Sequence, residues 1–245
     1  MIIYTVITEE NCPVPDQEVI DSRFKYICLH SVEVEKKYPW TYVKIKKENN
    51  ELYTYAKYKI LCPFEESFFV DAKLVFTNTF YQICENFYHY DIVVNKHPYR
   101  TSFLDEVVDW LILPVFRYED AIEYIQDVKN MGYPFMSGNA CLTNLMYRKN
   151  ANDFNRVWWM NWLQFKKRNQ LSFYLADFYT SKKVLYTAQD CVRVFKHQPP
   201  RWTNSEMREY NLKKLVCFQK DLQKMNIEYK FNYEALLTRG FNFVV

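Results

Sequence analysis

An aspartate and a lysine, separated by one alanine, follow a short apolar run in this 245-residue sequence. The run covers residues 67–70, and Asp71, Ala72 and Lys73 come directly after it. A carboxylate at the C-terminal end of a strand in an open α/β sheet lies where such folds bind ligands. A lysine ammonium is a point charge that suits phosphate. These residues therefore predict a ligand site at the end of a strand.

A second group of ionisable residues follows the strand predicted at 90–94. His97, Arg100, Asp105 and Glu106 supply an imidazole, a guanidinium and two carboxylates within ten residues. Arginine suits bidentate recognition of phosphate, and a carboxylate can act as general base on a hydroxyl group. The same composition is equally typical of a surface loop that caps a helix. The sequence leaves both interpretations open.

Two further groups carry weaker signals. Arg168, Asn169 and Gln170 close a tryptophan-rich segment, where a basic run complements a helix dipole and uncharged amides can orient hydroxyl groups. His197 lies beyond the strand-like residues 192–195. A lone histidine is more often structural than a ligand, and Mg²⁺ or Mn²⁺ is bound mainly through oxygen. His197 is therefore a candidate metal ligand only if it lies near Asp71.

Strands and helices alternate along the chain and predict an α/β class. We expect strands at residues 2–7, 24–30, 40–45, 67–70, 90–94 and 142–146. The polar–apolar alternation of residues 40–45 is typical of a sheet edge. We expect helices at residues 52–62, 119–129, 154–166 and 205–224, the last of which Thr203 and Glu206 can begin as a capping box.

The composition excludes several classes of protein. A chain of 245 residues predicts one domain, spanning 1–245, on which a C-terminal helix at about 203–226 packs. Only 3 glycines occur, too few for a Gly-rich dinucleotide loop or a P-loop, and the 7 cysteines form no CxxC pair. A net charge of +3, scattered along the chain, gives little support for binding nucleic acid. The sequence has no signal peptide and no transmembrane segment, so we expect a soluble, cytoplasmic protein.

Together these motifs resemble a glycosyltransferase-like family. The best-known members of that family are plant turgor-regulation and mucilage-related proteins, and similar domains occur in bacteria and in large viruses of algae and protists. The resemblance spans residues 2–180. It rests on the order of the following segments: residues 4–7, 26–28, 56–61, 69–73, 97–100, 105–106, 158–159 and 168–173.

The resemblance implies a GT-A-like nucleotide-binding fold, with a central, mixed but mostly parallel sheet flanked by helices. An Asp-x-Asp-like motif led by Asp71 would hold the donor diphosphate, Thr5 and Val6 would border its nucleoside, and Lys59 would approach phosphate. The full set of implied donor-binding residues is Thr5, Val6, Lys59, Asp71, Ala72, Lys73, His97, Arg100, Arg168 and Gln170.

Two positions depart from the pattern of this family. Lys73 stands where a second oxygen ligand is usual, and an ammonium is a donor only. Either Asp71 and His197 hold Mn²⁺ or Mg²⁺ without it, or Lys73 replaces the metal. Asn169 stands where an aspartate is common, so the expected catalytic positions Asp105, Glu106 and Asn169 contain a carboxylate only at the first two. Asp177 is a further candidate base.

The function that the resemblance implies is transfer of a sugar from a UDP- or GDP-linked donor to a hydroxyl of a glycan or glycoprotein. The alternative, motivated by Lys73 and Asn169, is a catalytically weakened domain that binds nucleotide or glycan without turnover. Many Lys, Asn, Tyr and Phe residues with few glycines are also typical of an AT-rich genome, as in large viruses.

Overall fold

The structure, a computed structural model, describes most of the chain. The described residues are 1–10, 12, 14, 17–97, 100–112, 117–135, 140–165, 169–187, 192–194 and 205–231, with side chains excepted at 110, 192–194 and 205–212. Contacts divide the chain into two compact units. The first comprises Met1–Lys96 and Leu142–His197, and the second comprises His97–Cys141 and Gln198–Val245. Whether both belong to one domain of residues 1–245 stays a prediction.

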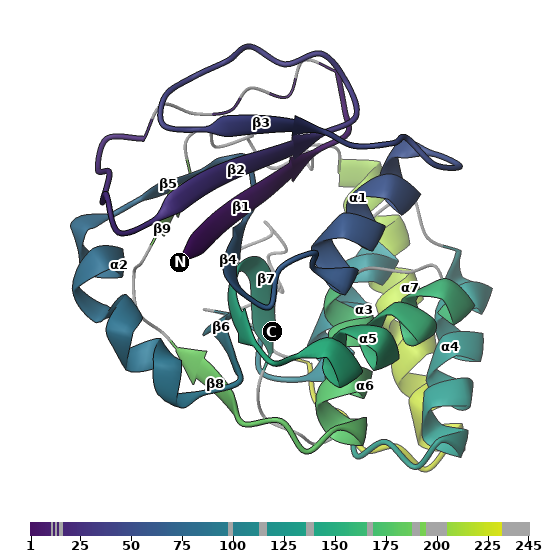
Figure 1. The fold of residues 1–245 in the computed structure, drawn as a ribbon. Coiled ribbons are helices and arrows are strands. Elements are labelled where there is room, and N and C mark those ends of the chain that lie inside the picture. The colour runs from purple at the N-terminus through teal and green to yellow at the C-terminus, as the bar shows by residue number, and fades with distance from the viewer. Residues whose placement is uncertain are drawn as a thin grey trace. The chain divides into compact units, whose positions relative to one another are not determined.

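The first unit is built on a mixed sheet whose described strands number seven, in the order β3-β2-β1-β4-β7-β6-β8 (Figure 1). Parallel pairs join β1 to β2, β2 to β3, β1 to β4 and β6 to β8, whereas β7 runs antiparallel to β4. The strands are β1 (Ile2–Ile7), β2 (Lys25–His30), β3 (Thr41–Lys44), β4 (Glu66–Val70), β6 (Ile92–Lys96), β7 (Cys141–Lys149) and β8 (Val184–Thr187). A small antiparallel sheet pairs β5 (Leu74–Phe76) with β9 (Val192–Val194).

Strand β4 lies in the middle of the sheet and is buried on both faces. Because successive side chains of a strand point to opposite faces, Phe68 and Phe69 serve two different cores. Phe68 packs against Phe80 of α2 (Asn78–Ile83), with ring centroids 5.0 Å apart. Phe69 packs on the other side against Tyr4, with centroids 5.4 Å apart. Because both faces of β4 are buried, the position of this strand in the sheet is fixed. Asp71 follows its last residue directly.

Helices cover both faces of this sheet. The 3₁₀ helix η1 (Cys84–His89) joins α2 on the Phe68 side, where the rings of Phe68 and Phe87 lie 6.2 Å apart. On the Phe69 side lies α1 (Glu51–Leu61), followed outward by α5 (Asn152–Phe165) and α6 (Asn169–Tyr179) (Figure 1). Trp158 of α5 packs edge-on against Phe173 of α6 at 5.2 Å. The predicted α/β class is confirmed, and its mixed, mostly parallel sheet fits the expected GT-A-like arrangement.

Helix α1 begins and ends where local chemistry predicts. Asn50 has an extended backbone, and its side chain accepts a hydrogen bond of 2.8 Å from the Tyr53 N–H, which caps the N-terminus. Cys62 follows the last turn with a φ of 44°, a left-handed value that takes the chain out of the helix before Pro63. Asn50 and Cys62 therefore define the two ends of α1.

The second unit contains three described helices that pack on one another: α3 (Phe103–Ile112), α4 (Tyr118–Asn130) and α7 (Ser205–Lys224). Phe103 fills its core and stacks on Tyr124 at 5.8 Å. Tyr118 donates a hydrogen bond of 2.7 Å to Asp221, which ties α4 to α7. The predicted C-terminal helix is thus present, and it begins at Ser205.

Most predicted elements are confirmed within two residues at each end, and the prediction that residues 40–45 form a sheet edge is also right, since β3 is the edge strand. Other elements of the structure were not predicted from the sequence: α2, η1, α3, α6, β5 and β8. Of these, α3 follows Thr101, where a surface loop was an open interpretation, and α6 begins at Asn169. Of the three tryptophans of α5, Trp158 and Trp162 are buried, and Trp159 is only partly so.

Candidate functional site

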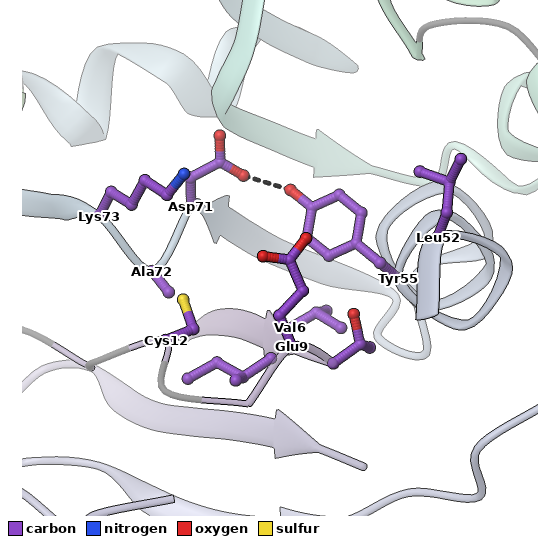
Figure 2. A pocket seen from close by; sticks show the side chains of 10 residues that line it. Val6, Glu9, Cys12, Leu52, Tyr55, Asp71, Ala72 and Lys73 are labelled. Carbon is purple, nitrogen blue, oxygen red and sulfur yellow. Dashed lines mark hydrogen bonds between the residues drawn. The ribbon is translucent and has the colours of Figure 1, made fainter. Parts of the chain in front are cut away.

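A pocket of about 220 Å³ opens at the C-terminal ends of β1 and β4 (Figure 2). These two strands are parallel, so their carboxyl ends meet at one edge of the sheet. Helix α1 contributes the third side. The described lining residues all belong to the first unit and are Val6, Ile7, Thr8, Glu9, Cys12, Leu52, Tyr55, Asp71, Ala72 and Lys73.

Asp71 is the first residue after β4 and sits in a tight turn. Its N–H donates a hydrogen bond of 2.8 Å to the carbonyl of Asn144, which continues the pairing with β7 for one residue. Its own carbonyl accepts a hydrogen bond of 3.0 Å from Leu74 N–H. The turn therefore fixes the backbone of Asp71, Ala72 and Lys73 beside the pocket.

Tyr55 of α1 reaches the Asp71 carboxylate directly. Its phenol donates a hydrogen bond to Asp71 Oδ1, drawn as the dashed line in Figure 2. Burial of the phenol and the negative charge of Asp71 together raise the pKa of Tyr55 well above its ordinary value. The phenol consequently keeps its proton at physiological pH and remains a donor to the carboxylate.

Lys59 lies one helical turn after Tyr55, on the same face of α1. Its side chain is only 4% exposed, and its ammonium is 3.7 Å from Asp71 Oδ1. The ammonium also lies over the Phe69 ring, 4.7 Å from the centroid, and 3.4 Å from the Tyr55 oxygen. A buried ammonium needs such partners because its charge has been removed from water. Asp71 is therefore paired with a cation from inside the protein.

Buried Arg148 of β7 fixes the turn of α1 that carries Lys59. Its guanidinium donates to the carbonyls of Lys59 and Ile60 at 2.7 and 2.8 Å, to Asn155 Oδ1 at 3.0 Å, and to the phenol of Tyr4. A cation at a helix C-terminus complements the helix dipole and satisfies its last carbonyls. Arg148 is a positioning residue for the side of the pocket formed by α1.

The opposite side of the pocket carries an exposed lysine and a less exposed thiol. Lys73 is exposed, and among the described residues no hydrogen bond or ion pair engages its ammonium. Burial raises the pKa of the Cys12 thiol; the nearby Lys73 opposes this increase, while Glu9 and Asp71 add to it. At neutral pH Cys12 is therefore a neutral thiol, and the charged groups of the lining are Glu9, Asp71 and Lys73.

Five of the residues predicted to bind the donor come together here: Val6, Asp71, Ala72 and Lys73 line the pocket, and Lys59 lies against Asp71. Thr5 precedes Val6 in β1 and is fully buried, and its hydroxyl has no hydrogen-bond partner among the described residues. The roles of these residues in binding stay predictions.

The second predicted cluster forms a network within the second unit. Buried Arg100 pairs with Glu106 and with Asp109, whose Oδ2 lies 2.8 Å from the guanidinium. His97 Nδ1 accepts a hydrogen bond of 3.0 Å from the Arg100 N–H. Every one of these contacts orders the start of α3.

Asp105 caps the same helix. Its Oδ2 accepts from the N–H groups of Thr101 and Ser102 at 2.7 and 3.0 Å, and Ser102 Oγ accepts in return from Asp105 N–H at 3.1 Å. Tyr229 donates to Oδ1 at 2.7 Å. The capping interpretation of this segment is thus confirmed, while the catalytic roles of Asp105 and Glu106 stay predictions.

Asn169 and Gln170 begin α6 in the first unit. The Asn169 carbonyl accepts hydrogen bonds from Trp158 Nε1 at 2.9 Å and from Ser172 Oγ at 3.1 Å. Its buried side-chain oxygen has no partner within the part of the chain that the structure describes. Arg168 and His197 lie outside the described residues.

The side chains at Asp71 do not fit a divalent cation held by protein ligands. Asp71 Oδ1 already accepts from Tyr55 and faces the Lys59 ammonium. Lys73, at the position of a second ligand, can only donate. Across the described ranges, no group of three His, Cys, Asp or Glu side chains gathers as a metal-binding cluster.

Tyr55 lines the pocket and contacts Asp71, and the sequence interpretation missed it. A usable signal was present, because Lys59 was already a candidate and Tyr55 precedes it by four residues on a predicted helix. The contact from Tyr55 to Asp71 depends on how α1 packs on the sheet, and no local pattern encodes that distance. The lining residues Ile7, Thr8, Glu9, Cys12 and Leu52 were also missed, because no local pattern shows which residues the fold gathers around one pocket.

Several solved structures resemble this chain at low sequence identity. No protein-family profile matches the sequence, and no curated protein matches it significantly. Among solved structures, the galactosyltransferase LgtC in complex with donor and acceptor sugar analogues has a TM-score of 0.41 at 9% identity, over 76% of this chain and 73% of its own. Mouse xyloside xylosyltransferase 1 has a TM-score of 0.40 at 7% identity, over 76% and 84%.

A third similar structure is residues 1–349 of S. aureus TarS in complex with UDP-GlcNAc, with a TM-score of 0.40 at 10% identity, over 96% of this chain and 69% of that one. Likenesses at these TM-scores and identities establish neither the fold nor the activity of this chain. We assign the fold from the strand order and strand directions of this chain. Within the described residues, no helix has the length and apolarity needed to cross a bilayer.

Proposed function

We propose that this protein is a GT-A-like glycosyltransferase that binds a nucleoside diphosphate sugar in the Asp71 pocket and transfers the sugar to a hydroxyl group. One observation carries the proposal: a pocket at the carboxyl ends of parallel strands β1 and β4 contains Asp71, which α1 orients through Tyr55 and Lys59. Open α/β sheets bind their ligands at this edge. The sequence resemblance adds the expected chemistry.

The proposed reaction requires positive charge beside the leaving diphosphate. As the glycosidic bond to the donor breaks, negative charge develops on the leaving diphosphate, and preorganised positive groups beside it stabilise the transition state. Lys73 lines the pocket and supplies such a charge. Val6 lies beside it at the end of β1, where the resemblance expects the nucleoside. UDP- and GDP-linked sugars are the proposed donors, and a glycan or glycoprotein is the proposed acceptor.

The cofactor implied by the resemblance is Mn²⁺ or Mg²⁺, held by Asp71 and His197. Such an ion would act as a Lewis acid on the diphosphate. Since the described donors at Asp71 do not fit it, we assign no step of the reaction to a metal.

The catalytic base is a separate part of the proposal. Asn169 carries an amide, which cannot accept a proton at neutral pH, so Asp105 and Glu106 are the proposed candidates. Both carboxylates already hold hydrogen bonds within the second unit. Asp105→Asn and Glu106→Gln test them separately: a base would lose about 10²-fold in kcat, with little change in the KM of the donor. A purely structural role would instead lower the melting temperature.

The decisive experiment measures sugar transfer. Purified protein is incubated with a panel of UDP- and GDP-sugars, with and without an added glycan acceptor, and the nucleoside diphosphate released by transfer to the acceptor or to water is quantified. We expect release with at least one donor and a loss of about 10²-fold in Asp71→Asn. Asp153→Asn, which changes a largely exposed carboxylate on α5, serves as the matched control and should retain activity. The proposal fails if no nucleotide sugar binds or turns over.

The alternative function is a catalytically weakened domain of the same fold that binds nucleotide or glycan. It is favoured by Lys73 in place of an oxygen ligand and by Asn169 in place of a carboxylate. It predicts nucleotide binding by calorimetry without turnover. Transfer that Asp71→Asn abolishes would exclude it. For either function we propose that the protein acts in the cytoplasm, and the composition favours a viral gene.

A further inference from the structure

Two lysines lie near Asp71, and they differ in exposure: Lys59 is buried and Lys73 is exposed. In the pocket, the carboxylate is paired with Lys59, a buried ammonium 3.7 Å from Oδ1. That ammonium is also fixed by the Phe69 ring, 4.7 Å from its centroid, and by the Tyr55 oxygen at 3.4 Å. With only 4% of its side chain exposed, Lys59 cannot swing out to solvent without losing all three contacts. The Lys59 ammonium thus lies on the inner side of Asp71 and pairs with its carboxylate.

This pairing works against a divalent cation at the same carboxylate. An ion on Oδ1 would have to replace the hydrogen bond from Tyr55 and would lie within a few ångströms of the Lys59 ammonium. Like charges at such separations repel strongly where water is excluded, and the repulsion doubles for a doubly charged ion. The carboxylate that would anchor a metal is therefore already neutralised.

On the open side of the pocket, Lys73 has the opposite character. It is exposed, it lines the pocket beside Asp71 (Figure 2), and no hydrogen bond or ion pair engages it within the described part of the chain. A lysine ammonium has three donors on a flexible stem and binds phosphate as a point charge. Because Lys59 balances Asp71, the charge of Lys73 is not cancelled by its neighbour in the turn.

We propose that this pocket binds the diphosphate of its ligand without a divalent metal, with Lys73 contacting the phosphate oxygens and Lys59 neutralising Asp71. The proposal rests on the proposed function, since it takes a nucleoside diphosphate as the ligand. It assigns the two lysines different tasks. Lys59 is a positioning residue, and Lys73 is the residue that touches the ligand.

The test is calorimetric titration of the full-length protein with UDP and with GDP, each in EDTA and in Mn²⁺. We expect one of the two nucleotides to bind in EDTA, with a Kd within about threefold of its value in Mn²⁺. Lys73→Ala should raise this Kd by about tenfold or more, the effect of losing one charge-assisted contact. Lys46→Ala, at an exposed lysine outside the pocket, should leave it unchanged.

A second variant reverses the charge at position 73. Lys73→Asp places a carboxylate where the ammonium stood, and we expect it to lose nucleotide binding in EDTA and in Mn²⁺ alike, because Lys59 still neutralises Asp71. Thermal unfolding of each variant checks that the fold is retained, which an exposed position favours.

Three outcomes would count against the proposal, and they differ in what they reject. Binding by the wild type only in Mn²⁺ rejects the metal-free site but leaves the proposed function intact. Binding in EDTA that Lys73→Ala does not weaken rejects the role of Lys73. No binding of UDP or GDP under either condition rejects the proposed function, and this inference with it.

Discussion

Tyr55 donates a hydrogen bond to Asp71, which lies 16 residues later in the chain, and so joins the first helix to the turn after the central strand β4. The donor is fixed in its protonated form because burial and the charge of Asp71 raise the pKa of Tyr55 well above its usual value. The acceptor is therefore oriented before any ligand arrives. Preorganisation of this kind reduces the cost of binding.

The first prediction concerns this hydrogen bond. Tyr55→Phe removes the donor and keeps the ring, which lies 6.4 Å from the ring of Phe69. Because hydrogen bonds to charged groups contribute about 1.5–3 kcal/mol, we expect the Kd for UDP or GDP to rise by about tenfold. Calorimetry measures the change. Tyr53→Phe is the matched control, since Tyr53 packs on Trp159, away from the pocket lining. Unchanged affinity in Tyr55→Phe, alongside weakened binding in Asp71→Asn, would refute the orienting role.

The second prediction compares two lysines of the same helix. Lys59→Met leaves the Asp71 carboxylate without its buried partner and should lower the free energy of unfolding by about 2 kcal/mol. Lys57, 2.6 Å from Glu48, forms a pair whose side chains are 33% and 26% exposed. We expect Lys57→Met to cost about 0.5 kcal/mol, since such pairs are well solvated. Urea denaturation followed by circular dichroism gives both values, and equal costs would contradict the assignment of Lys59 as a buried partner.

The sequence predicted α1 well because its signals are local. Asn50 supplies the cap, the apolar positions recur at helical spacing, and Pro63 follows the end. The strand before Asp71 was equally visible as an apolar run. What the sequence did not predict was the partner of Asp71, because the contact with Tyr55 depends on the angle at which α1 crosses the sheet. Tertiary packing fixes that angle.

The Arg100 cluster is a segment for which the sequence left two interpretations open. An arginine and two carboxylates close in sequence are compatible with phosphate chemistry and also with a helix start, and composition does not separate the two. The separating information lies in α3, where Glu106 and Asp109 are one helical turn apart and both face Arg100. Predicting α3 would have shown that a guanidinium before it has two intramolecular partners.

The third prediction tests the support beneath α1. Arg148→Met keeps much of the apolar volume but removes the donors that reach the carbonyls of Lys59 and Ile60. With several buried groups left unsatisfied, we expect a loss of about 3–5 kcal/mol in the free energy of unfolding. Arg156→Met, on the exposed face of α5, should change it by less than about 0.5 kcal/mol. A loss in Arg148→Met no larger than this control would show that the network contributes little.

The last prediction is a pH dependence at Asp177 of α6. Burial raises the pKa of this carboxyl, and the hydrogen bond from Tyr186 only partly opposes the shift. The folded state therefore binds a proton more tightly than the unfolded chain, in which an aspartate has a pKa of about 3.9. Between these two pKa values, stability falls as the pH rises, because folding must desolvate a charge that the unfolded chain keeps in water.

Asp177→Asn removes that charge, so we expect its melting temperature to exceed that of the wild type at pH 7. The difference should shrink toward zero as the pH falls below about 4, where the wild-type carboxyl is protonated in both states. Asp153 gives the opposite sign: burial is the largest single influence and acts to raise its pKa, but the hydrogen bond and charge of Lys182, together with backbone N–H hydrogen bonds, lower the pKa overall. Asp153→Asn should therefore lose stability at pH 7 and regain parity in acid. Thermal unfolding from pH 3 to pH 8 measures both, and parallel curves for the two variants would contradict the assignment.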